Sequence, residues 1–180
     1  ALEAIHQSLL EMTRSTHDSV DQILGWLVCI QAFKSVILGN FGVGALIVDR
    51  NGNLWSQGHN EVMKPYFRSD AHAEMVVLSR FEAEYPDLKL PGLTLYTSLE
   101  PCPMCYTRLL GSSMDEVVFV ADDEPGGMVS RRDLMPPYWR AMENNCHFRK
   151  AKTRTELEPI SLSIFSTNSS DLMSPIPRTL

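Results

Sequence analysis

Two short motifs constrain this chain more than any other feature: His72-Ala73-Glu74 and Pro101-Cys102-Pro103-Met104-Cys105. Histidine nitrogen and cysteine sulfur are ligands that Zn²⁺ prefers, and a catalytic zinc site usually combines three protein ligands with one open position for water. The motifs supply three such ligands and one additional carboxylate. The predicted ligands are His72, Cys102 and Cys105, and the predicted catalytic group is Glu74. We therefore expect one Zn²⁺ per chain, with the carboxylate moving protons beside it.

Each motif lies where a predicted strand passes into a predicted helix. Cys102 and Cys105 are three residues apart, so both sulfurs fall on one side of the first helical turn. The helix dipole and the free amides of that turn favour thiolates. His72 and Glu74 are two residues apart, and at the start of a helix both can reach a ligand beyond its end. The spacing thus predicts two helix N-termini that converge on one metal ion.

Two other readings of the motifs remain open. A Cys-x-x-Cys pair that opens a helix is also typical of redox dithiols. A purely structural zinc site needs a fourth protein ligand, and the nearest spare imidazole, His59, is expected to pack or hydrogen-bond at the end of a strand. The joint occurrence of both motifs favours catalytic zinc.

Hydrophobic periodicity and turn signals predict an α/β fold. The expected helices cover residues 19–38, 71–84, 102–110, 131–144 and 156–165, with a short one near 5–12, and the expected strands cover 43–48, 54–58, 93–98, 116–121 and 146–152. Asn51-Gly52 indicates a hairpin between the first two strands. We expect a three-layer α/β/α sandwich with a central mixed five-stranded sheet, in which an N-terminal hairpin precedes parallel strands.

The expected organisation is an N-terminal extension (1–18), a zinc-dependent domain (19–165) and a C-terminal tail (166–180). The tail is rich in Ser, Pro and Asn and is expected to be poorly ordered or to wrap the surface. The four cysteines do not form a disulfide-like pattern, no signal-peptide pattern is present, and Gln31, Lys34 and Ser35 interrupt the longest apolar stretch. These features predict a cytoplasmic protein that does not span a membrane.

The formal net charge of the chain is −6 and its pI is about 5.3. Proteins that grip a nucleic-acid backbone usually present a basic patch. The basic clusters here, Arg131-Arg132 and the stretch 149–154, are expected to be solvated surface. The charge therefore favours a small substrate.

The chain resembles the cytidine deaminase-like superfamily, whose signature is His-x-Glu followed by Pro-Cys-x-x-Cys. Within it, the chain is most similar to the branch that holds guanine deaminases and tRNA-specific adenosine deaminases. The similar stretches are 42–45, 58–60, 71–74 and 96–105, with a weaker match over 117–127. The resemblance implies hydroxide attack at the amine-bearing ring carbon, release of ammonia, and a homodimer.

The resemblance also implies substrate-binding residues. Asn60 matches a family asparagine that binds the base or its sugar, although it is also a suitable turn residue. Asp123 falls where relatives place a polar substrate contact, and Ala73 lies within the motif itself. Tyr66 and Phe67, in the loop before the first motif, either stack on a base or pack the loop.

Some positions depart from the family pattern. Arg68-Ser69-Asp70 stands where relatives often have Asp-Pro-Thr, Tyr106-Thr107-Arg108 replaces small residues, and 136–140 falls where relatives add pocket or lid elements. The leading prediction is a hydrolytic deaminase of purine metabolism acting on a nucleobase, nucleoside or related small aminated heterocycle, with a guanine-like purine favoured. The alternatives are adenosine-to-inosine editing of tRNA and a catalytically silent zinc-binding assembly protein, against which the presence of Glu74 argues.

Overall fold

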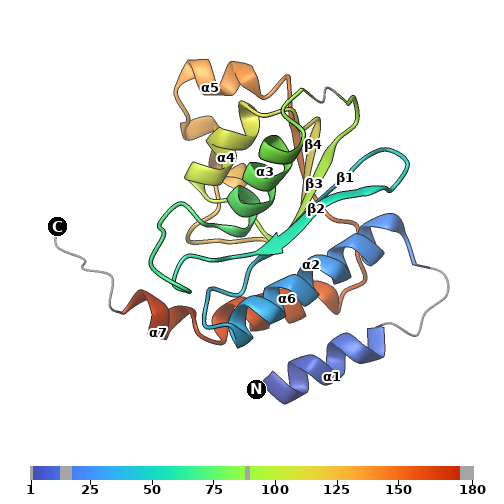
Figure 1. Ribbon diagram of the computed structural model, residues 1–180, viewed down its shortest axis with the longest axis vertical. Coiled ribbons are helices and arrows are strands. Elements are labelled where there is room, and N and C mark those ends of the chain that lie inside the picture. Colours follow the sequence, from blue (N-terminus) through green and yellow to red (C-terminus); the bar gives the residue numbers. More distant parts are fainter. Residues whose placement is uncertain (1, 13–17, 88–89, 175–180) are drawn as a thin grey trace.

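A mixed five-stranded sheet forms the centre of the protein (Figure 1). The computed structural model describes residues 2–12, 18–87 and 90–174. The strands are β1 (Gly44–Val48), β2 (Leu54–His59), β3 (Thr94–Leu99), β4 (Glu116–Ala121) and β5 (His147–Lys150), in the order β2-β1-β3-β4-β5. β1 pairs antiparallel with β2 and β3, whereas the β3-β4 and β4-β5 pairs are parallel. The predicted sheet is confirmed.

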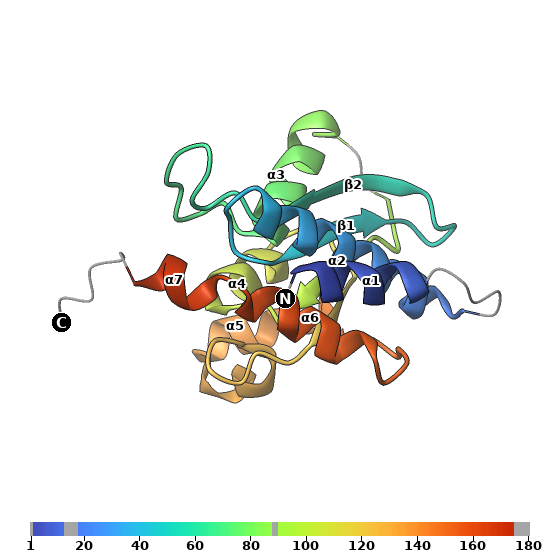
Figure 2. The same ribbon diagram turned by 90° about the horizontal axis from the view of Figure 1, so that it is seen from below.

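Helices cover both faces of the sheet and make the predicted three layers. One face is covered by α2 (Val20–Ile37) and α6 (Leu157–Ser166), and the other by α3 (Ala73–Glu84) and α4 (Pro103–Leu110) (Figure 1). The helix α1 (Leu2–Met12) lies outside the first pair and contacts both of its members, and the short α7 (Ser169–Met173) follows α6 (Figure 2).

The alternation of side chains along β1 explains why one strand serves two cores. Ala45 and Ile47 pack into the cluster below α3 and α4, whereas Leu46 and Val48 pack into the cluster below α2 and α6. Successive side chains of a strand point to opposite faces, so a strand covered on both sides reads as a continuous apolar run. All five residues of β1 are accordingly buried.

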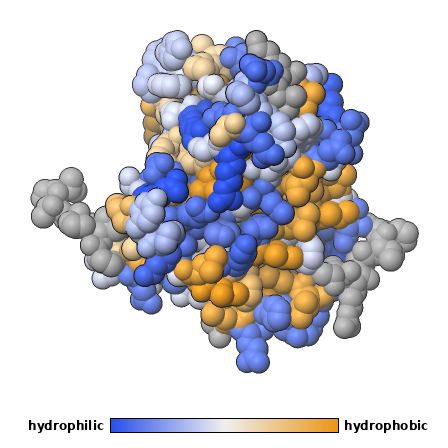
Figure 3. Space-filling view, viewed as in Figure 1, coloured by the Kyte–Doolittle hydropathy of each residue, from blue (hydrophilic) through white to orange (hydrophobic). Residues whose placement is uncertain are grey.

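The helix α2 has the length and composition of a membrane-spanning helix, with 18 residues and a mean hydropathy of 1.4. Here it packs against β1, β3 and α6 as the central helix of its layer. Ser19 caps its N-terminus by accepting a hydrogen bond from the Gln22 amide at 3.2 Å, and Gly39, with φ of +81°, follows its C-terminus. In the lower half of Figure 3, apolar surface gathers over α1 and α2, where Val20 and Ile23 are exposed.

The single helix predicted over 131–144 is wrong. The chain instead forms a short 3₁₀ segment, η1 (Val129–Leu134), and a separate helix, α5 (Pro137–Met142). Met135 and Pro136 between them are extended, with ψ of 147° and 150°. A proline removes an amide donor and disfavours helical geometry in the residue before it, so two successive prolines break the helix.

Both terminal segments contain helices where the structure describes them. Ile5 and Leu9 of α1 are buried in the same cluster as α2 and α6. In the tail, the described residues include the end of α6 and the whole of α7, which lies along the surface. The predicted N-terminal extension (1–18) and C-terminal tail (166–180) also include residues 13–17 and 175–180, which lie outside the described part of the chain.

Candidate functional site

The two motifs meet at the N-termini of α3 and α4. His72 is the residue that precedes α3, and Cys102 precedes α4, each with extended backbone angles, while Cys105 lies in the first turn of α4. The Nδ1 atom of His72 is 3.6 Å from each of the two sulfurs. The three ligand atoms all lie within 4.8 Å of one another. The expected convergence of two helix N-termini is therefore present.

These separations fit a zinc ion. With Zn–N of about 2.0 Å and Zn–S of about 2.3 Å, tetrahedral coordination places nitrogen and sulfur ligands ~3.6 Å apart. The set of one imidazole and two thiols also leaves one position of a tetrahedron without a protein ligand. The donor atoms thus suit a catalytic zinc better than a structural one.

The two cysteine side chains differ in how readily they ionise. The hydrogen bond from Cys105, followed by the contact with His72, lowers the pKa of Cys102 to about 4. The same sulfur–sulfur hydrogen bond, together with burial, raises the pKa of Cys105 well above its ordinary value. Metal binding requires that this remaining proton leave, so metal affinity here depends on pH.

Glu74 lies beside the ligands without belonging to them. It is 3% exposed, and its Oε1 accepts a hydrogen bond from the Thr97 hydroxyl at 3.3 Å. Its Oε2 is 3.6 Å from the sulfur of Cys105. Burial raises the pKa of Glu74 above its usual range. A carboxyl group whose pKa is shifted towards neutrality is suited to accept and return a proton.

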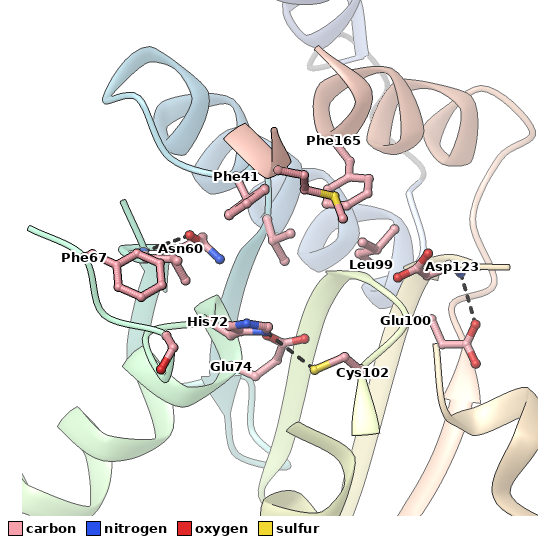
Figure 4. Close-up of a pocket in the computed structure, with 14 residues that line it drawn as sticks. Phe41, Asn60, Phe67, His72, Glu74, Leu99, Glu100, Cys102, Asp123 and Phe165 are labelled. Atoms are coloured by element: carbon pink, nitrogen blue, oxygen red, sulfur yellow. Dashed lines mark hydrogen bonds between the residues drawn. The ribbon is translucent and has the colours of Figure 1, made fainter. Parts of the chain in front are cut away.

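A cavity of about 340 Å³ opens above the ligands and the carboxylate (Figure 4). It lies at the carboxyl end of β3 and at the N-terminus of α3, where loops and helix termini converge. Its lining comprises Phe41, Val43, Asn60, Val62, Phe67, Ser69, His72, Glu74, Leu99, Glu100, Cys102, Asp123, Phe165 and Met173. Apolar side chains thus surround a small number of polar groups, as in most small-molecule sites.

Asn60 lies in a turn and also lines the cavity. It is 3% exposed, and its Oδ1 accepts a hydrogen bond from the Val62 amide at 3.0 Å, which forms a tight turn after β2. Its amide nitrogen lies on the cavity side (Figure 4) and makes no hydrogen bond to a described residue. The turn therefore holds a donor group at the cavity.

The expected aromatic pair divides between cavity and surface. Phe67 lines the cavity, although it is 60% exposed, whereas Tyr66 is 66% exposed and does not line it. Ala73 does not line the cavity either, because its side chain is fully buried in the core below α3. Only its backbone amide, in the first turn of the helix, remains for a contact with a ligand.

Asp123 lines the cavity from the segment that follows β4. Its Oδ1 accepts a hydrogen bond from the Gly126 amide at 3.2 Å, and burial raises the pKa of its carboxyl group. A second cavity of about 720 Å³ adjoins the first, and Asp123, Glu100 and Phe165 border both. Asp122, considered beside Asp123 in sequence, borders only the second cavity and pairs with Lys150 at 2.6 Å.

Sequence reasoning missed the remaining walls. Phe41 precedes β1, and Phe165 and Met173 belong to the C-terminal helices. Apolar residues in such places look like ordinary packing residues, so no local signal marks them. The segment 136–140, considered for the pocket or a lid, forms part of α5 and borders neither cavity.

Comparison with known protein families agrees with this geometry. The family described as the cytidine and deoxycytidylate deaminase zinc-binding region matches residues 27–121, which include both motifs. This chain belongs to that family. The protein therefore has a zinc-binding deaminase domain, and the three ligand atoms described above form its candidate zinc site.

Among known proteins, the chain is similar to tRNA-specific adenosine deaminases. It is 39% identical to that of Bacillus subtilis (strain 168) over 97 residues, which are 54% of this chain and 59% of the relative. It is 36% identical to that of Haemophilus influenzae over 103 residues, which are 56% and 58% of the two chains. The chain thus spans less than two thirds of the length of these relatives.

Solved structures share the fold at lower identity. A structure from work on A-to-I editing by tRNA:A34 deaminases superimposes with a TM-score of 0.66 at 23% identity, covering 79% of this chain and 98% of that one. Guanine deaminase from Nitrosomonas europaea gives a TM-score of 0.65 at 20% identity, covering 87% and 91%. The cytidine deaminase-like fold is thereby confirmed.

Proposed function

We propose that this protein is a zinc-dependent hydrolytic deaminase that removes the exocyclic amino group of a free nucleobase, nucleoside or related small aminated heterocycle and releases ammonia. A guanine-like purine is the favoured substrate. The observation that carries this proposal is that the chain's own C-terminal helices form part of the cavity wall.

Phe165 of α6 lines the cavity opposite the loop that bears Phe67 (Figure 4), and Met173 of α7 also lines the cavity. The volume of the cavity, about 340 Å³, lies near the lower end of the range for small-molecule sites. The side chain of Asn168, between the two helices, donates a hydrogen bond to the carbonyl of Asn40 at 2.8 Å and ties this segment to the end of α2. These contacts narrow the space around the cavity, which favours a free base over a base presented on a folded RNA loop.

The roles of the residues follow from their positions. His72, Cys102 and Cys105 hold the zinc ion, which when bound supplies a water-derived nucleophile at neutral pH. Glu74 would accept a proton from the attacking water and deliver it to the ring nitrogen. A second proton, from the hydroxyl of the resulting tetrahedral adduct, would pass through the same carboxylate to the departing amine, so that ammonia leaves as the ring carbonyl forms.

The cavity walls bind and orient the base. The amide nitrogen of Asn60 donates to an acceptor on the ring, and Asp123 accepts from a ring or exocyclic N–H. Phe67 and Phe165 pack against the faces and edges of the ring, which also excludes water.

The charge near the cavity also supports a substrate without phosphates. Asp122, Asp123 and Glu158 border the second cavity, and one cation beside them, Lys150, is paired with two of these carboxylates at 2.6 Å. A polyanion that approaches this edge would be repelled. A homodimer is part of the proposal and rests on the family resemblance alone, whereas the proposed cytoplasmic location rests on the cysteine pattern of the sequence.

Adenosine-to-inosine editing of tRNA is the second candidate, because the tRNA-specific adenosine deaminases above are 39% and 36% identical to this chain. A catalytically silent assembly role is the third, and the presence of the Glu74 carboxylate beside the ligands argues against it.

One assay separates the three candidates. Ammonia release by zinc-loaded protein is measured with guanine, adenine, cytosine, their nucleosides, aminated triazines and unmodified tRNA, with Glu74→Ala alongside. Turnover of a free base or nucleoside that depends on Glu74 supports the proposal. Turnover of tRNA alone establishes editing, and zinc-bound protein without turnover on the whole panel contradicts both enzymatic candidates.

A further inference from the structure

Glu100 is a buried carboxylate that the proposed chemistry does not use. It stands between β3 and the ligand Cys102 and is 3% exposed. Its Oε2 accepts a hydrogen bond from the Asp123 amide at 3.0 Å, and its Oε1 accepts one from the Ser130 amide at 2.8 Å. None of the salt bridges found among the described residues includes it. Both of its oxygens therefore accept hydrogen bonds from backbone amides of the segment 122–130.

Steric contacts reinforce this arrangement. A Cβ atom at Gly127 would lie 2.3 Å from the carboxyl carbon and Oε2 of Glu100, so no other residue fits there without a shift. The amide of Met128 donates to the carbonyl of Pro101 at 2.9 Å. The segment 122–130 is thus held against the chain just before α4, at the point where the metal ligands begin.

The segment 122–130 carries Asp123, which forms the far wall of the cavity (Figure 4). The hydrogen bond of the Asp123 side chain, to the Gly126 amide, stays within the segment and cannot anchor it to the sheet. We propose that Glu100 is a positioning residue, which holds the segment 122–130 in place through its two amide contacts and thereby fixes Asp123 at the substrate. The inference deepens the proposed function and rests on it for the role of Asp123.

Amide hydrogen exchange tests the positioning directly. Glu100→Gln keeps the size of the side chain but replaces one acceptor oxygen with an NH₂ group, which cannot accept from a backbone amide. In the zinc-loaded variant, we expect exchange of at least one of the Asp123 and Ser130 amides, the one that loses its acceptor oxygen, to become at least about tenfold faster, with exchange within α3 unchanged. Glu124→Gln makes the same chemical change at an exposed position of the segment and should leave exchange unchanged. Unaltered protection of the two amides in Glu100→Gln would overturn the proposal.

Kinetics test the consequence for the substrate. With guanine as the probe, we expect Glu100→Gln to raise KM about tenfold, to change kcat less than about threefold, and to retain one zinc per chain. Because Glu100 acts through Asp123, the effects of Glu100→Gln and Asp123→Asn on KM should not add in the double variant. Additive effects, loss of zinc, or a fall in kcat at unchanged KM would each contradict the role assigned to Glu100.

Failure of the proposed function gives a different result. If the wild-type protein does not deaminate guanine, the small-molecule proposal loses its favoured substrate, while the exchange measurement still decides whether Glu100 holds the segment. If Glu100→Gln does not fold, Gly127→Ala disturbs the same contact from the other side and is expected to speed exchange of the same two amides. Unaltered exchange in that variant would refute the inference.

Discussion

Replacement of Glu74 by glutamine should separate catalysis from metal binding. The carboxylate contacts the ligand set only through the thiol proton of Cys105, which leaves when metal binds, so the variant should retain one zinc per chain. General acid–base catalysis typically contributes 10²- to 10⁴-fold, and we expect kcat to fall by about that factor, equivalent to ~3–5 kcal/mol of transition-state stabilisation.

The same substitution should not destabilise the protein. Burial raises the pKa of Glu74 in the folded state, so the stability associated with its protonated form is lost as pH rises through that pKa. Glutamine does not ionise and can still accept from the Thr97 hydroxyl. In the zinc-free protein at pH 8, the variant should therefore have a Tm equal to or above that of the wild type.

Zinc content, ammonia release and thermal unfolding would be measured in parallel. Glu84→Gln makes the same change at an exposed position of the same helix and should leave all three unchanged. Loss of zinc from Glu74→Gln would show that the carboxylate supports the metal. More than about a tenth of wild-type activity would refute its assignment as the catalytic group.

Three further perturbations test other parts of the structure. Cys102→Ser should lose stoichiometric zinc, seen by elemental analysis, and lower Tm, because two helix N-termini lose their shared metal. Asp21→Ala removes a partly buried partner of Arg149 and should cost about 2–3 kcal/mol in urea unfolding. Burial raises the pKa of Asp21, but hydrogen bonds led by that from Arg149 lower it overall. The stabilisation by Asp21 is therefore full above its unfolded pKa and is lost as pH falls through the folded one. Phe165→Ala should raise KM for a base about tenfold with little change in kcat, because it removes an apolar contact with the base that is remote from the proton transfers. An unchanged KM would contradict a role of α6 in the cavity wall.

Sequence patterns correctly predicted those helices, strands and turns that depend on residues close together in the chain. The Asn51-Gly52 turn, the apolar run of β1 and the periodicity of α2 each depend on residues close in sequence, and the structure confirms them. The helix predicted over 131–144 shows the limit of periodicity, because it ignored the backbone constraint of Pro136 and Pro137.

The sequence by itself determined the zinc chemistry, because Cys102 and Cys105 share one helical turn and His72 and Glu74 share another, so a few local contacts fix each pair. The walls of the cavity were decided only by tertiary structure. Phe41 and Phe165 are separated by more than a hundred residues. They line the same cavity because α6 packs beside α2 on one face of the sheet. Apolar side chains have no directional chemistry, so their sequence context does not distinguish a cavity wall from a core position. The local motifs therefore indicate the class of reaction. The choice of substrate depends on the cavity walls, which are formed only when distant segments pack together.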